Sequence, residues 1–108
     1  MGIDTDKVRE LNDAFRTSFV GGKVLATPGI TAQADLEIIL RKVQSFDSFC
    51  EDNNPHHEND FGSFFHNGKQ IFWKVDYYNV ELSAGSPDPS DPSVTTRTLT
   101  VTLRRVTN

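Results

Sequence analysis

The apolar positions near the start of the chain lie three and four residues apart. They are Val8, Leu11, Phe15 and Phe19. This spacing places them on one stripe and predicts a helix in this first segment. Asp4 or Thr5 can cap the start of this helix, and Gly21-Gly22 can end it.

Residues 23–27 predict a short strand, which Pro28-Gly29 stops. A second apolar stripe follows, made of Leu36, Ile39, Leu40, Val43 and Phe46. Its spacing predicts another helix, for which Thr31 is the expected cap.

From residue 61 the apolar residues alternate with other residues, which is the period of a strand. Asn67-Gly68 predicts a two-residue type I′ turn, because both of its positions require positive φ. Counting outward from this turn sets Phe61 opposite Lys74 and Gly62 opposite Trp73. One face of the hairpin then carries Phe64, Ile71, Trp73, Val75 and Tyr77. The other face carries Phe61, Phe65, Phe72, Lys74, Asp76 and Tyr78.

The last part of the chain predicts a loop and one more strand. Residues 83–93 contain three prolines and form the loop. Leu99, Val101 and Leu103 then alternate with polar residues. The expected fold class is α+β: two helices packed on one face of a small antiparallel sheet of about four strands, in the order α-β-α-β-β-β. The 108 residues suit a single domain, 1–108.

Composition narrows the class of protein. Fifteen acidic and eleven basic residues give a net charge of −4, which argues against direct binding to nucleic acid. No apolar run approaches the ~20 residues that span a bilayer, and the start of the chain lacks the apolar core of a signal peptide, so we expect a cytoplasmic protein with no membrane contact. Cys50 is the only cysteine, which suits a reducing compartment. Its acidic neighbours make it a poor nucleophile, and we expect it to be a small core residue.

The acidic residues are unevenly distributed. Residues 43–68 and 75–96 contain no lysine or arginine, yet they hold nine of the fifteen carboxylates. These are Asp47, Glu51, Asp52, Glu58, Asp60, Asp76, Glu81, Asp88 and Asp91. Because the hairpin turn closes one end of the hairpin, both segments are expected to start from its open end and to form one acidic surface there.

This surface has three interpretations. It can simply keep the protein soluble. It can bind a cation, with His56, His57, Glu58 and Asp60 as the candidate ligands, although no known metal-binding spacing is present. It can also dock on a basic partner protein. The expected partner-binding residues are Glu51, Asp52, Glu58, Asp60, Asp76, Glu81, Asp88 and Asp91.

The aromatic residues on the outer hairpin face, Phe61, Phe65, Phe72 and Tyr78, complete the expected partner-binding set. A loop, the C-terminal segment or a partner subunit could instead cover them. With Lys69, Lys74, Arg97 and Arg104 they could also hold single-stranded nucleic acid, which the acidic surface makes less attractive. No nucleophile, oxyanion device or phosphate loop accompanies the acids, so the residues favour a binding protein without a cofactor over an enzyme.

Several motifs together resemble an uncharacterised bacterial family of small plasmid and mobile-element proteins, a domain of unknown function. These are NDAFR (12–16), TPGI (27–30), ENDFG (58–62), WKVDYY (73–78) and SPDPSDPSVTTRTLT (86–100). The resemblance implies one stand-alone domain and no particular mechanism. The acidic loop departs from the family pattern, because Asn54 replaces an acid, His57 a glycine and Asn59 a histidine. A catalytic or metal site that used that acid and that histidine would be impaired here.

A small acidic protein of mobile-element type suggests a working hypothesis. It is an inhibitor of a host nucleic-acid-handling defence complex, with anti-CRISPR or anti-restriction activity, that occupies a basic surface because carboxylates imitate phosphates. The alternatives are a metal-dependent enzyme that uses the loop 51–60, and a self-associating scaffold that uses the aromatic face. The sequence leaves the oligomeric state open.

Overall fold

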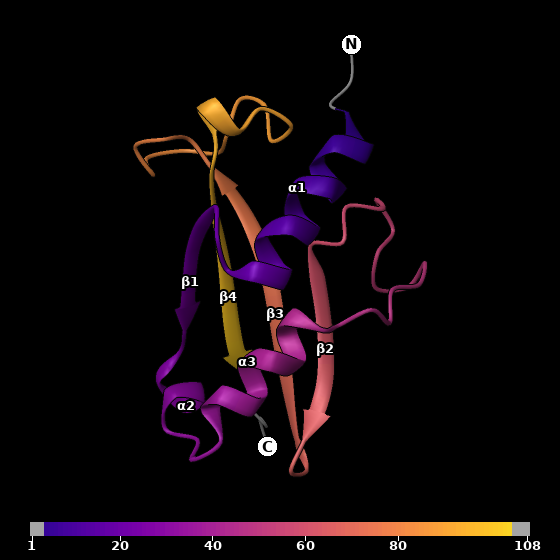
Figure 1. The fold of residues 1–108 in the computed structure, drawn as a ribbon, viewed down its shortest axis with the longest axis vertical. Helices are drawn as coiled ribbons and strands as arrows, with labels where there is room; N and C mark the ends of the chain where they lie inside the picture. The colour runs from indigo at the N-terminus through magenta and orange to yellow at the C-terminus, as the bar shows by residue number, and fades with distance from the viewer. Residues whose placement is uncertain (1–3, 105–108) are drawn as a thin grey trace.

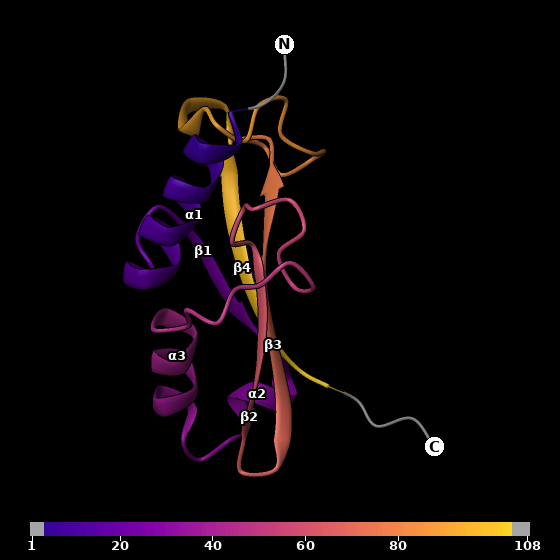
Figure 2. The ribbon, with the colours of Figure 1, turned by 90° about the vertical axis from the view of Figure 1, so that its right-hand side faces the viewer.

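The computed structural model describes residues 4–104, which form a four-stranded sheet with helices on one face (Figures 1 and 2). The elements are α1 (Thr5–Ser18), β1 (Gly22–Ala26), α2 (Pro28–Thr31), α3 (Leu36–Gln44), β2 (Phe61–His66), β3 (Lys69–Tyr78), the short 3₁₀ helix η1 (Pro92–Val94) and β4 (Thr96–Leu103). Figure 2 shows α1 and α3 together on one side of the sheet. The predicted α+β class is confirmed.

Helix α1 begins as predicted and ends earlier than predicted. The Asp4 side chain accepts a hydrogen bond from the amide of Lys7 at 3.1 Å. The helix ends at its C-cap Phe19, which is left-handed with φ of 59°, and Gly21 two residues later also has a positive φ, of 107°. The Phe19 ring packs against the core, and this contact offsets the strain of a left-handed conformation. Gly22 instead opens β1, where a Cβ would lie 2.8 Å from the Phe15 ring.

The second predicted helix is divided into two. Pro28 opens the single turn of α2, and Thr31 ends that turn, so Thr31 is not the cap of the long helix. Helix α3 starts after Asp35. Phe46 lies beyond its end but still packs edge-on against Trp73, with ring centroids 5.5 Å apart.

The hairpin register is the one that the turn predicts. Phe61 pairs with Lys74 and Gly62 with Trp73. Asn67 and Gly68 have φ of 51° and 75°, as a type I′ turn requires.

The sheet is mixed and not antiparallel, because its order is β1-β4-β3-β2. Strand β4 runs antiparallel to β3 but parallel to β1, with Gly22 opposite Arg97. Alternation of side chains fixes the face toward which each residue points, and it carries no information on the neighbouring strand. The expectation of an antiparallel sheet is therefore wrong for β1.

The core fills the space between the helices and one face of the sheet. Its buried members are Phe15, Ile30, Ile39, Val43, Ile71, Trp73, Val75, Leu99 and Val101. Among the described residues, no helix combines the length and the apolar character needed to cross a membrane.

Candidate functional site

The loops 50–60 and 79–95 emerge at the end of the sheet opposite the hairpin turn (Figure 1). We call these two loops the acidic end. The register of the hairpin requires this placement, because Phe61 and Lys74 are paired where the first loop enters the sheet. The chain beyond Lys74 continues along β3 into the second loop.

A buried amide connects the acidic end to the rest of the fold. Asn12 is fully buried, and its Nδ2 donates to the carbonyl oxygen of Glu58 at 2.9 Å and to the hydroxyl of Tyr77 at 2.7 Å. Its Oδ1 accepts from Nε of Arg97 at 2.8 Å. One side chain of α1 thus contacts the loop 50–60, β3 and β4. We call Asn12, Glu58, Tyr77 and Arg97 the anchor network.

The other contacts of the anchor network reach the second loop. The Tyr77 hydroxyl donates to Oε1 of Glu58 at 2.6 Å. The Arg97 guanidinium lies over the Tyr77 ring, 5.2 Å from its centroid, and donates to the carbonyl of Pro89. Burial and the bond to Glu58 raise the pKa of Tyr77, whereas burial lowers the pKa of Arg97. The phenol is therefore neutral at physiological pH and donates to a carboxylate.

A second polar cluster orders the middle of the first loop. Nδ2 of Asn59 donates to both carboxylate oxygens of Asp13, at 3.1 and 3.2 Å. Asn54 and Asn59 exchange two further hydrogen bonds, at 2.6 and 2.9 Å. Asn54 and Asn59 therefore pair with each other inside the loop. His57 and Asn59 both have left-handed backbones, with φ of 58° and 53°.

Arg16, the last residue of NDAFR, joins the two long helices. Its side chain is buried and donates to the carbonyls of Val43 and Gln44, each at 3.0 Å. These carbonyls belong to the C-terminal end of α3, where the carbonyl of Val43 also accepts from the amide of Phe46 at 3.3 Å. The guanidinium also lies 5.2 Å from the centroid of the Trp73 ring.

Two carboxylates of the second loop fold the loop itself. Asp88 accepts from the amide and the hydroxyl of Ser90, at 3.0 and 2.5 Å. Asp91 accepts from the amide and the hydroxyl of Ser93, at 2.9 and 2.6 Å, and these bonds lower its pKa. Asp88 and Asp91 thus have a structural role that the sequence analysis did not assign.

The remaining predicted partner-binding residues differ in exposure. Glu58 is turned inward to Tyr77, and Asp76 lies 3.3 Å from Nζ of Lys74. Asp60 is half-buried, and burial together with the charges of Glu58 and Asp76 raises its pKa. The exposed carboxylates of the predicted set are Glu51, Asp52 and Glu81, and its exposed aromatic residues are Phe65 and Tyr78.

The predicted metal ligands are not arranged as a cage. Within residues 4–104, no group of three or more His, Cys, Asp or Glu side chains could hold a metal ion. His56 and His57 are exposed, while Glu58 bonds to Tyr77. Cys50 is also exposed, so the expectation of a core cysteine is wrong. It follows α3 in a loop where its amide donates to Oδ1 of Asn53 at 2.9 Å.

Sequence reasoning missed the buried polar residues. Asn12 lies four residues after Val8 and three before Phe15, so it belongs to the apolar stripe of α1. A polar residue on such a stripe signals a buried hydrogen-bond partner. Arg97 gives the same signal. It alternates with the outward-facing threonines of β4, so it lies on the core face of that strand.

The motifs meet in the anchor network. NDAFR supplies Asn12, ENDFG supplies Glu58, WKVDYY supplies Tyr77, and SPDPSDPSVTTRTLT supplies Arg97. No curated protein and no solved structure matches the chain. One family profile, described as Protein of unknown function (DUF3768), matches residues 5–105. The chain therefore belongs to the DUF3768 family, whose function is unknown.

Proposed function

We propose that this chain is a protein-binding module that docks its acidic end on a basic surface of a partner protein. The observation that supports the proposal is that both loops of the acidic end are attached to the anchor network. Glu58 of the first loop belongs to the anchor network, and the carbonyl of Pro89 in the second loop accepts from Arg97 of the same network. A surface that is ordered before binding loses less conformational entropy on association.

The charges available at this end suit such a role. Glu51, Asp52 and Glu81 are exposed. An anionic surface speeds the encounter with a basic partner and orients it. Carboxylate oxygens also accept hydrogen bonds from arginine and lysine in the manner of phosphate oxygens.

We further propose that the partner belongs to a nucleic-acid-handling defence complex of the host, either a CRISPR effector or a restriction enzyme. Such complexes contain basic surfaces that hold phosphates. A module that occupies one of these surfaces would inhibit the complex. The net charge of −4 and the mobile-element type that the sequence resemblance implies support this choice.

Phage plating on defence-proficient hosts tests the proposal. Expression of the protein is expected to raise the plating efficiency on at least one restriction-proficient or CRISPR-proficient strain. The double variant Glu51→Lys with Asp52→Lys is expected to abolish this effect. The matched control is Glu10→Lys with Glu37→Lys, which makes the same change of charge at two exposed residues of α1 and α3. Equal plating efficiencies with both variants, or no effect of the unaltered protein, would overturn the proposal.

A further inference from the structure

The sheet has a second surface, on the side opposite α1 and α3. Figure 2 shows this side without a helix, and we call it the outer face. Side chains alternate along β3, so Ile71, Trp73 and Val75 face the core while Phe72, Lys74 and Asp76 belong to the outer face.

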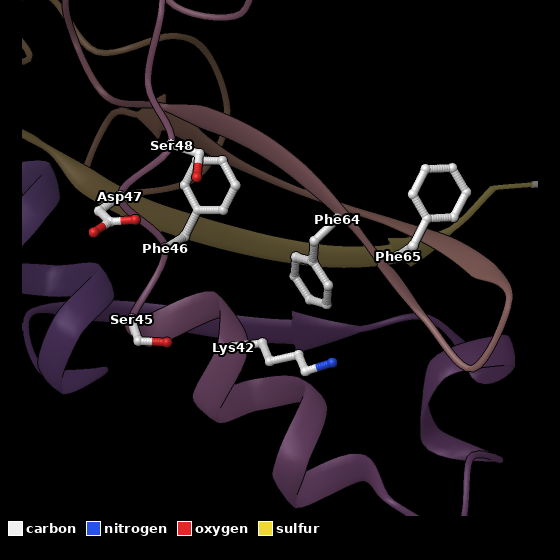
Figure 3. A pocket seen from close by; sticks show the side chains of 7 residues that line it. All are labelled: Lys42, Ser45, Phe46, Asp47, Ser48, Phe64 and Phe65. Carbon is white, nitrogen blue, oxygen red and sulfur yellow. The ribbon is translucent and has the colours of Figure 1, made fainter.

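Aromatic rings are concentrated on β2 and β3. The rings of Phe61 and Phe72 are stacked, with centroids 5.8 Å apart and an interplanar angle of 29°. Both rings are only partly buried. Phe65 is 69% exposed, and Figure 3 shows that it points away from α3, whereas Phe64 points toward that helix. The outer face thus offers several aromatic surfaces to a ligand.

The outer face carries more cations than carboxylates. Lys74 lies in the middle of the outer face, with 60% of its side chain exposed. Lys23 on β1 belongs to the same face, since it pairs with Thr98, which in turn pairs with Asp76. Arg104 also reaches it, because its Nη1 donates to Oε1 of Gln70 at 2.8 Å. Among the charged residues of this face that the structure describes, Asp76 supplies the negative charge, and its Oδ2 lies 3.3 Å from Nζ of Lys74.

Hydroxyl groups complete the surface. Thr100 pairs with Lys74, and Thr102 pairs with Phe72. Both threonines are half-buried on the outer side of β4. They place donors and acceptors between the cations and the aromatic rings.

We infer that the outer face binds single-stranded nucleic acid. Unpaired bases stack on exposed aromatic rings, while lysine and arginine hold the phosphates, and this combination tolerates any base sequence. A duplex keeps its bases stacked on one another and does not offer them to Phe61 or Phe72. The net charge of −4 argued against such binding, but the exposed carboxylates Glu51, Asp52 and Glu81 lie in the loops of the acidic end.

A second copy of the chain fits this face less well. Face-to-face packing of two copies would bring Lys23, Lys74 and Arg104 of one copy against the same three cations of the other. The excess of positive charge over the single carboxylate of Asp76 disfavours such an association. An anionic ligand with flat rings matches both the charge and the aromatic character of the face.

Fluorescence anisotropy with labelled 12-nucleotide oligo(dT) and oligo(U) tests the inference at low salt. The unaltered protein is expected to bind both single strands and to bind a 12-base-pair duplex at least tenfold more weakly. Phe72→Leu, which retains an apolar side chain but removes the ring, is expected to weaken binding roughly tenfold. Lys74→Glu is expected to weaken binding and to reduce the dependence of the dissociation constant on salt.

The matched control is Arg41→Glu, which makes the same charge change as Lys74→Glu on the exposed side of α3. It is expected to retain most of the affinity of the unaltered protein. Absence of single-strand binding, equal binding of the duplex, or equal losses for Lys74→Glu and Arg41→Glu would overturn the inference. Sedimentation is the second measurement: a concentration-dependent dimer that Phe72→Leu abolishes would assign the face to a second copy instead.

Discussion

Asn12 and Arg97 lie 85 residues apart along the chain and form a buried hydrogen bond of 2.8 Å. The bond joins the first helix to the last strand. Because the same Asn12 amide also contacts Glu58 and Tyr77, the position of the acidic loop depends on contacts from both ends of the sequence. The loop that sequence analysis singled out is thus supported by residues far from it.

Replacing Asn12 tests this dependence. Asn12→Ala is expected to lower the free energy of unfolding by about 3 kcal/mol, because it leaves the buried Nε of Arg97 and the carbonyl of Glu58 without their partner. Urea denaturation measures the change. Glu10→Ala, at an exposed position of the same helix, is the control and is expected to change stability by less than about 0.5 kcal/mol. Equal stabilities of the two variants would show that the network contributes nothing.

The environment of Tyr77 predicts that the stability of the folded chain decreases at alkaline pH. Burial and the bond to Glu58 raise the pKa of Tyr77 in the folded chain above its ordinary value. The folded state thus favours the neutral phenol, and its contribution to stability is complete below about pH 10 and is lost as the pH rises further. Thermal unfolding between pH 8 and 11 should show this loss. Tyr77→Phe should be less stable at pH 8 and should show a smaller decrease above pH 10.

Asp60 is predicted to lower the stability of the folded chain at neutral pH. Burial and the neighbouring charges of Glu58 and Asp76 raise its pKa in the folded state. Its stabilising contribution is therefore present at acidic pH and is lost as the pH rises through its folded pKa. Asp60→Asn is expected to raise the melting temperature at pH 7 and to leave it nearly unchanged at pH 3. A lower melting temperature at pH 7 would contradict the assignment.

Gly62 tests the packing of the hairpin on the core. A Cβ at this position would lie 2.6 Å from Nε1 of Trp73 and 2.8 Å from the Phe46 ring. Gly62→Ala is expected to cost about 1–3 kcal/mol of stability, because the indole cannot move without disturbing its neighbours. Ser63→Ala, one residue later on the outer face, is the control. Near-ultraviolet circular dichroism, which reports the environment of Trp73, measures the change in packing.

The hairpin could be predicted from sequence because its information is local. Asn67-Gly68 determines the turn, and the turn determines every later pair down to Phe61 and Lys74. The placement of Gly62 opposite Trp73 followed from the same counting. The helices were predictable for the same reason, except at their ends, where Phe19 and Thr31 took unexpected positions.

The remaining features depend on contacts between distant segments. Nothing in the alternation of residues 23–27 or 98–104 states that β1 and β4 are neighbours. The inward turn of Glu58 likewise requires Tyr77 and Asn12, which come from other elements. Uniform acidity therefore suggested one surface of equivalent carboxylates, whereas the fold divides them into exposed residues and residues that hold the loops.

The last strand along the chain lies inside the sheet, between β1 and β3. During synthesis the hairpin can close early, but β1 has no neighbour until residues 96–103 have left the ribosome. Folding that depends on contacts so distant in sequence is slow. A nascent chain would thus display both aromatic strands and an unpaired β1 at once, and chaperone capture at this stage would set the yield of the finished protein in the cell.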